Sequence, residues 1–252
     1  MRVSALCSLE GAFMQGEDIQ VALTARAVAY RTLSALFDED SPEIIDIAAN
    51  GTFLDAIQIL ASFGATTLDE CAGELQLVLD EVCKMGPVAF ANMISGDFAK
   101  LFVGPDKLLA PPWESVYRTH ERVLFGKCTL DVRRAYRDAG YIPEGYPHVA
   151  DDHIALELGF MGLLAERSLA ASRINASADF REGLRKQHDF LSEHLALWID
   201  GFSGMVGAAP VCRFYKVLAL TVNRLVRCDG EIIEKLLQGS VGCREELISD
   251  SR

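Results

Sequence analysis

The sequence lacks a hydrophobic run long enough to cross a membrane. Its longest stretch without a charged residue has 13 residues, 56–68, whereas a membrane-spanning helix needs about 20 apolar residues. The apolar start of the chain is interrupted by Glu10, and no small-residue cleavage site follows it. We therefore expect no signal peptide and no integral membrane segment, and we expect the protein to be cytoplasmic.

The motifs of several enzyme classes are also missing. The chain has neither the G-x-G-x-x-G turn of dinucleotide-binding folds nor the P-loop pattern G-x-x-x-x-G-K followed by Ser or Thr. Its five histidines include no His-Glu-x-x-His pair, and its seven cysteines lie at least 12 positions apart. This spacing favours reduced thiols over a disulfide framework or a zinc site. No cofactor is expected.

Basic residues are scarce. The chain has 24 Lys and Arg against 36 Asp and Glu, which gives a formal net charge of −12 at pH 7. Such a charge disfavours general attraction to nucleic-acid phosphates and favours basic partners. The excess is uneven, because the first 110 residues contain 16 acidic and 6 basic residues and the remainder contain 20 and 18.

Helical periodicity runs through nearly the whole chain. Apolar residues recur every three or four positions, and no strand-like alternation of useful length occurs. We therefore predict an all-α fold, a single helical bundle of about ten helices. In the first half of the chain these helices are expected over residues 18–37, 42–51, 53–61, 67–86 and 88–102.

A loop rich in glycine and proline is predicted over residues 104–112. We expect it to join two helical layers of one domain, residues 18–238. The acidic layer would cover residues 18–103 and the C-terminal layer residues 113–238, with residues 1–17 and 239–252 as terminal extensions.

The second half of the chain contains the most apolar helix, which begins at Ile154 and is expected to lie buried at the centre. Asp151 or Asp152 is the expected N-cap of this helix, and Thr129 that of a short helix before it. Three glycines predict a loop over residues 201–210. Two helices are expected after that loop, over residues 211–225 and 231–237.

One acidic cluster at the start of the apolar helix invites a catalytic interpretation. It consists of Asp151, Asp152, His153 and Glu157, and the last two lie one helical turn apart. As a metal or acid–base site, it would make the protein a helical metal-dependent hydrolase. The structural alternative is that an aspartate simply caps the helix by accepting its free N–H groups.

Two segments carry more specific motifs. The first is Leu101-Phe102-Val103-Gly104-Pro105 with Ala110-Pro111-Pro112-Trp113-Glu114-Ser115-Val116-Tyr117, and the second is Asp152-His153 followed by Leu156-Glu157-Leu158-Gly159-Phe160-Met161. They resemble the central motif and the Glu-Pro-x-Asp-His motif of the TorD/DmsD family of cytoplasmic chaperones for molybdenum oxidoreductases. Val149-Ala150 stands where that family usually has Glu-Pro, so the loop entering the helix is expected to differ in shape and charge. Weaker similarity extends the resemblance over residues 18–235.

The resemblance implies an all-helical, non-enzymatic chaperone. Its partner would be a molybdenum oxidoreductase apoprotein, bound through its twin-arginine signal peptide. Export of the partner would be delayed until the molybdopterin cofactor has been inserted. Because dimers formed by segment exchange occur in the family, a monomer and such a homodimer both stay open.

A receptor for a twin-arginine leader needs carboxylates for two guanidinium groups and an apolar groove for the adjoining segment. We expect the two motif segments to converge on such a groove. Trp113 and Tyr117 would be apolar anchors, Glu114 and Asp152 arginine acceptors, and His153 an orienting hydrogen-bond partner. The full expected binding set is Trp113, Glu114, Ser115, Tyr117, Glu121, Asp152 and His153.

Each of these roles has a structural alternative. Trp113 and Tyr117 could fill the junction between the helical layers, and Glu114 could cap the turn after it. Capping by Asp152 is compatible with binding, because a capping carboxylate keeps free lone pairs. A plain scaffold that binds a partner helix, without a signal-peptide role, is a further alternative for the whole protein.

Overall fold

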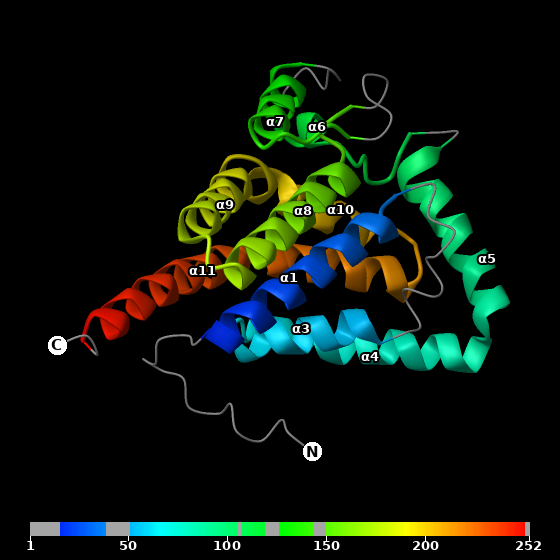
Figure 1. Cartoon of the computed structure of the whole chain (residues 1–252). Helices are drawn as coiled ribbons and strands as arrows, with labels where there is room; N and C mark the ends of the chain where they lie inside the picture. The colour runs from blue at the N-terminus through cyan, green and yellow to red at the C-terminus, as the bar shows by residue number, and fades with distance from the viewer. Residues whose placement is uncertain (1–15, 39–50, 105–106, 119–125, 144–149, 250–252) are drawn as a thin grey trace.

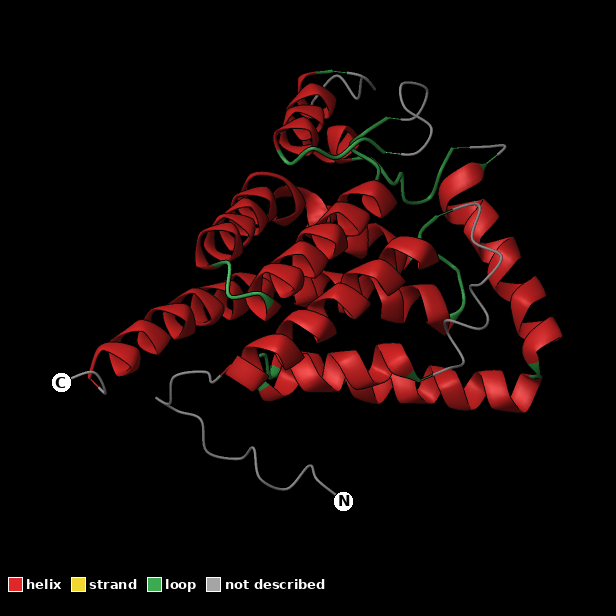
Figure 2. Cartoon of the chain, in the orientation of Figure 1, coloured by secondary structure: helices red, strands yellow, loops and turns green. Residues whose placement is uncertain are grey.

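The computed structural model describes residues 16–38, 51–104, 107–118, 126–143 and 150–249, and the regular structure within them is helical (Figure 2). A single antiparallel β-bridge joins Trp113 to His153. The predicted all-α fold is confirmed, whereas nearly all of the helix expected over residues 42–51 lies outside the described residues. No helix in the described ranges is both long enough and apolar enough to span a lipid bilayer.

Two long helices form the centre of the bundle. Helices α1 (Gly16–Leu36) and α8 (Ile154–Arg173) pack side by side (Figure 1). Their close approach depends on the small Gly162, because a Cβ atom there would lie 2.9 Å from Cδ of Arg31. The hydroxyl of Ser34 also donates a hydrogen bond of 2.7 Å to a backbone carbonyl of α8. Most of α8 is buried, which confirms the central position predicted for it.

Other helices surround this pair. Helix α3 (Thr52–Ser62) packs against α1, and α4 (Thr67–Met85) packs against both α3 and α11 (Arg213–Ser249). Helix α9 (Ser177–Phe190) packs against α8 and α11. Helices from before and after the 104–112 segment therefore pack against each other.

Helix α5 (Pro87–Phe98) lies at one edge of the molecule and continues into a π-helical turn, η1 (Ala99–Val103) (Figure 1). Phe102 in this turn is buried, with its ring centroid 6.1 Å from that of Phe202 and 5.8 Å from that of Tyr215. The helix ends at Gly104, whose φ of 96° favours glycine. The break predicted at this position is confirmed.

The C-terminal third differs from the prediction in two places. Residues 201–210, predicted to form a loop, are helical as far as Ala208 in α10 (Ala196–Ala208), which follows a second π-helical turn, η2 (Leu191–Leu195). The two helices predicted over residues 211–225 and 231–237 are one continuous helix, α11. Both predictions are wrong, because the glycines in these segments lie inside helices and do not end them.

Tertiary contacts explain the glycine in α10. A Cβ atom at Gly201 would lie 2.8 Å from Cδ1 of Tyr117, so this glycine allows close packing and does not form a turn.

In α11, Asp229 lies immediately before Gly230 and forms a buried ion pair with Arg26, with Nε and Oδ1 2.6 Å apart. Tyr30 donates to the same carboxylate at 2.7 Å, and Gln187 accepts from Arg26 at 2.6 Å. This network joins α1, α9 and α11, and it stabilises the part of α11 where a break was expected.

Candidate functional site

The two motif segments meet at the β-bridge. The backbone N–H of Glu114 donates to the carbonyl of Asp152 at 2.9 Å, and the N–H of Ile154 donates to the carbonyl of Pro112 at 2.8 Å. The rings of Trp113 and His153 pack edge to face, with centroids 5.7 Å apart. The predicted convergence of the two segments is confirmed, while their binding role stays a prediction.

The side chain of Asp152 stabilises this junction from the protein interior. It is fully buried, and its two oxygens accept hydrogen bonds of 2.9 Å from the N–H of Ser115 and from the hydroxyl of Thr129. Thr129 lies inside α7 (Lys127–Asp138), whose N-cap is Gly126, so the capping role predicted for Thr129 is wrong. The hydroxyl instead links α7 to the motif segments.

The N-cap of α8 is His153 and not an aspartate. Nδ1 of His153 accepts the backbone N–H of Ala155 at 3.2 Å. Burial lowers the pKa of His153 to about 4, which keeps the imidazole neutral and able to accept at neutral pH. The cap predicted for Asp151 is wrong because its carboxylate pairs with Arg133, with Oδ2 and Nη2 2.6 Å apart.

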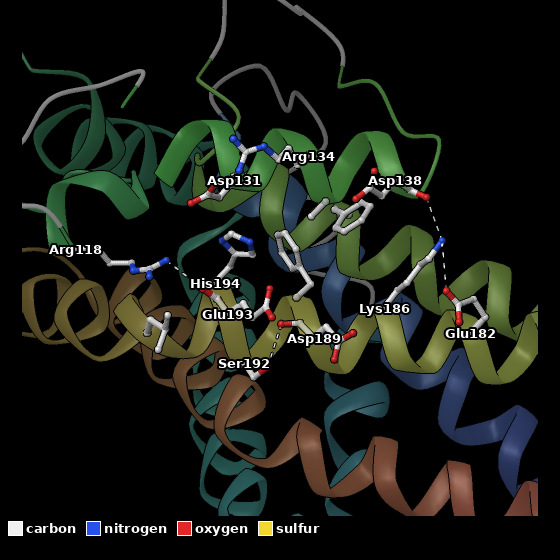
Figure 3. A pocket seen from close by; sticks show the side chains of 14 residues that line it. Arg118, Asp131, Arg134, Asp138, Glu182, Lys186, Asp189, Ser192, Glu193 and His194 are labelled. Atoms are coloured by element: carbon white, nitrogen blue, oxygen red, sulfur yellow. Dashed lines mark hydrogen bonds and ion pairs between the residues drawn. The ribbon is translucent and has the colours of Figure 1, made fainter. Parts of the chain in front are cut away.

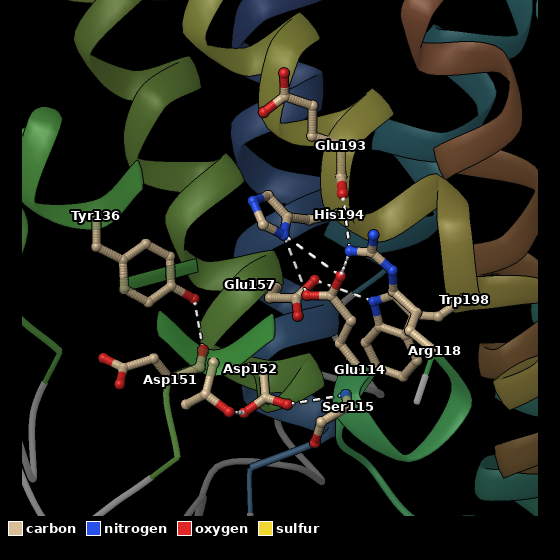
Figure 4. Close-up of polar contacts among 11 residues, drawn as sticks. Glu114, Ser115, Arg118, Tyr136, Asp151, Asp152, Glu157, Glu193, His194 and Trp198 are labelled. Atoms are coloured by element: carbon tan, nitrogen blue, oxygen red, sulfur yellow. Dashed lines mark hydrogen bonds and ion pairs between the residues drawn. The ribbon is translucent and has the colours of Figure 1, made fainter. Parts of the chain in front are cut away.

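Glu114 lies at the start of the short helix α6 (Glu114–Arg118) and is fully buried (Figure 4). Its carboxylate forms an ion pair with Arg118, one helical turn later, and lies 3.1 Å from Nδ1 of His194. Arg118 also donates to the backbone carbonyl of Glu193 at 3.1 Å. The carboxylate that was expected to accept an arginine of a partner therefore already pairs with Arg118 of its own chain.

A second buried carboxyl group lies beside Glu114. Burial, followed by the negative charges of Glu114 and Asp152, raises the pKa of Glu157 well above its ordinary value. Because the raised pKa favours the protonated form, Glu157 adds no second full negative charge beside Glu114. One oxygen of Glu157 accepts from Nε1 of Trp198 at 3.2 Å.

The aromatic residues of the motif have different surroundings. Tyr117 packs on α10, with its ring centroid 5.4 Å from that of Trp198 and 6.4 Å from that of Phe202. Trp113 and Tyr117 are both partly buried. Glu121, the remaining member of the expected set, lies outside the described residues.

A surface groove of about 930 Å³ opens next to this network (Figure 3). Its walls come from α7, α9, η2 and the ends of α6 and α10, and its lining includes Phe160 and Phe190, whose rings are almost fully buried. Acidic residues outnumber Lys and Arg in its lining. They are Asp131, Asp138, Glu182, Asp189 and Glu193, against Arg118, Arg134 and Lys186.

The acidic residues of the groove differ in how far they are neutralised. Asp131 pairs with Arg134 at 2.6 Å. The exposed carboxylates of Asp138 and Glu193, by contrast, form no ion pair with any residue that the structure describes. They are the groove's available acceptors for an incoming cation.

The acidic cluster of the hydrolase alternative is not assembled as a metal site. Asp151 is paired with Arg133, Asp152 with Ser115 and Thr129, and the Glu157 side chain with Trp198. Across the described ranges, no group of three or more His, Cys, Asp or Glu side chains is placed to hold a metal ion.

A family model described as the nitrate reductase delta subunit matches residues 65–203, more than half of the chain. Curated relatives carry TorD and DmsD names. A Vibrio cholerae "Chaperone protein TorD" is 29% identical over 145 residues, 58% of this chain and 64% of the relative. A Haemophilus influenzae protein named "Probable Tat proofreading chaperone DmsD" is 31% identical over 127 residues, 50% and 55% of the two chains. The chain belongs to the TorD/DmsD family.

A longer alignment links the chain to another TorD protein, from Shewanella pealeana, with 24% identity over 220 residues, 84% of this chain and 91% of the relative. The chain spans slightly less than two thirds of the Vibrio cholerae relative. A solved structure of a redox enzyme maturation protein from Archaeoglobus fulgidus is 16% identical, with a TM-score of 0.41, and the match covers 87% of this chain and 99% of that one.

All residues that line the groove fall inside residues 65–203, the range matched by the nitrate reductase delta subunit model. The predicted binding set did not include Arg118, Asp138, Glu193 or His194. The spacing of Glu114 and Arg118, one helical turn apart, is a signal for the ion pair. His194 comes from a distant segment, and only the folded structure shows that it contacts Glu114.

Proposed function

We propose that this chain is a cytoplasmic maturation chaperone. It binds the twin-arginine leader of a molybdenum oxidoreductase apoprotein and holds that precursor for cofactor insertion before export. Membership of the TorD/DmsD family and relatives named as TorD and Tat proofreading chaperones support this role. The structural observation that carries the proposal is the acidic groove beside the two joined motif segments.

The chemistry of the groove suits a cationic, partly apolar peptide. Two guanidinium groups need carboxylate acceptors, and charge-assisted hydrogen bonds to them are stronger than neutral ones. Asp138 and Glu193 are exposed and lie in the groove lining. Leu197 is 53% exposed there and offers apolar surface to the segment that follows the arginines.

In this proposal the motif residues build the wall of the groove more than they contact the leader. The buried Asp152 accepts hydrogen bonds from Ser115 and Thr129 and so positions α7 against the start of α8. Trp113 covers the His153 cap of the same helix. The binding roles first expected for Trp113 and Asp152 are replaced by positioning roles.

Calorimetric titration tests the binding claim. The probe is a synthetic peptide with two consecutive arginines followed by an apolar helix-forming segment. We expect Glu193→Gln to weaken its binding by about 0.5–1.5 kcal/mol, roughly two- to tenfold, because one charged acceptor is removed. Glu70→Gln is the matched control, since it removes the same charge from an exposed position on α4, outside the groove.

Absence of binding by the unaltered protein, or equal weakening by both variants, would contradict the proposal. The partner is tested separately by pull-down from cell extract. We expect the bait to retain a molybdenum oxidoreductase precursor and to lose it when the leader of that precursor is deleted.

A further inference from the structure

The buried carboxylate of Glu114 lies directly behind the groove wall. Arg118 and His194 both contact this carboxylate, and both also line the groove. Glu114 has no exposed side-chain surface, whereas the Arg118 side chain is 31% exposed. Arg118 therefore stands between a buried negative charge and the space that a ligand would enter (Figures 3 and 4).

The Glu114 carboxylate needs a cationic partner. A buried charge without one is strongly destabilising, and the neighbouring carboxyl group of Glu157 supplies no positive charge. Arg118 supplies a guanidinium from the last residue of the five-residue helix α6. It also donates to the carbonyl of Glu193 at 3.1 Å, so one guanidinium bridges α6 and η2.

The arrangement is a guanidinium site already filled from within the chain. Resting on the proposed function, we propose that Arg118 occupies the position that an arginine of the leader takes on binding. The leader's guanidinium displaces Arg118 from Glu114 and donates to the same two acceptors, the buried carboxylate and the carbonyl of Glu193. Glu114 is then a binding residue, and Arg118 is an internal competitor that weakens binding.

This site favours arginine over lysine. A guanidinium presents several N–H donors in a fixed plane, so it can donate to a carboxylate and a second acceptor together, whereas an ammonium is a compact point charge. Arg118 reaches both acceptors through Nη1 alone, so a leader guanidinium that also uses Nη2 or Nε can bind the carboxylate through two nitrogens, which an ammonium cannot do. A peptide with two lysines in place of the arginines is expected to bind less tightly at this site.

Titration of the arginine and lysine peptides into Arg118→Ala tests the competition. We expect the arginine peptide to bind this variant about tenfold more tightly than the unaltered protein, because the internal competitor is gone. The gain should be smaller for the lysine peptide. Arg134→Ala is the matched control, since it also removes one cation from the groove lining, but from a residue paired with Asp131 and not with Glu114.

If removal of a cation acted only through general electrostatics, Arg118→Ala and Arg134→Ala would have similar affinities, and the arginine and lysine peptides would gain affinity equally. That result, or weaker arginine-peptide binding by Arg118→Ala, overturns the proposal. If Arg118→Ala does not fold, Arg118→Lys replaces it in the same titrations. We then expect a smaller increase in affinity for the arginine peptide, because lysine keeps the charge but lacks the planar set of donors.

A measurement without any leader peptide separates this inference from the proposed function. Methylguanidinium added to Arg118→Ala is expected to raise its midpoint of thermal unfolding, relative to the same concentration of methylammonium. Neither ion should raise that of the unaltered protein, where the site is filled. If methylguanidinium stabilises Arg118→Ala but no leader peptide binds, the guanidinium site is supported and the chaperone role is contradicted. If the leader peptide binds, but methylguanidinium does not stabilise the variant and Arg118→Ala does not bind the peptide more tightly, the chaperone role is supported and the guanidinium site is contradicted.

Discussion

His153 shows how burial sets the behaviour of a single residue. Its imidazole accepts the N–H of Ala155 as the N-cap of α8, and its pKa is lowered to about 4 by burial. The unfolded chain binds a proton at this residue near pH 6.5, whereas the folded chain does so only near pH 4. The contribution of His153 to stability is therefore complete above pH 6.5 and falls as the pH drops through this window.

We expect His153→Asn to remove this pH dependence, which amounts to about 3 kcal/mol between pH 7 and pH 4. Asparagine is a good N-cap, so the helix start is retained. Urea unfolding at several pH values measures the effect. His188→Asn is the control, because the His188 side chain is 43% exposed and caps no helix; an equal loss of pH dependence in both variants would argue against the account of His153.

For single residues, the sequence could indicate which side chains belong to the site but not which groups they contact. The motif resemblance selected Glu114, Asp152 and His153, and all three lie where the two motif segments meet. Their individual roles could not be predicted, because the partners of Asp152 come from α6 and α7 and one partner of Glu114, His194, comes from η2. Hydrogen bonds across 23 to 80 positions leave no local sequence pattern.

Among the elements, α10 depends on a glycine that packs and does not break the helix. We expect Gly201→Ala to destabilise the protein by about 1–3 kcal/mol, although alanine is the better helix former, because the new Cβ would lie 2.8 Å from the Tyr117 ring. Gly204→Ala in the same helix has open space around its Cβ and should stabilise by about 0.5–1 kcal/mol.

Thermal or urea unfolding of the two variants checks the pair. Stabilisation by both substitutions would mean that Tyr117 does not pack against α10 as described. The contrast also explains the wrong prediction of a loop over residues 201–210: glycine spacing alone does not distinguish a turn from a helix that contacts a neighbouring ring.

Elements with a strong local pattern were predicted well. The ends of α1 and α3 lie within two residues of the expected positions, because an apolar stripe defines each helix. The continuity of α11 was missed because Asp229-Gly230 looks like a stop. It is stabilised by Arg26, which lies 203 positions earlier in the chain.

For the molecule as a whole, the buried pair of Arg26 and Asp229 joins its first and last described helices. We expect Arg26→Met to destabilise the protein by about 3–5 kcal/mol, because the substitution leaves Asp229 buried without its cation. Arg31→Met, on the same helix, breaks an exposed pair with Glu166 and should cost less than about 1 kcal/mol. Urea unfolding distinguishes the two, and similar small losses would show that the buried pair is not a major contributor.

The assignment of residues 18–238 to one domain with two layers stays a prediction. The packing of α1 on α8 and of α4 on α11 shows that helices from both proposed layers share contacts. Uneven charge along the chain suggested the division, but net charge carries no information about which helices pack together.

On the proposed function, an arginine-pair leader binds in the groove between α7 and α9. A second surface groove, of about 540 Å³ and lined by α1 and α3, offers a competing location. Hydrogen–deuterium exchange of the unaltered protein, with and without the arginine-pair peptide, distinguishes the two grooves. We expect added protection of amides in residues 127–138 and 186–197 and no change in α1, α3 or α4. Protection confined to α1 and α3, or no protection anywhere, would contradict this expectation.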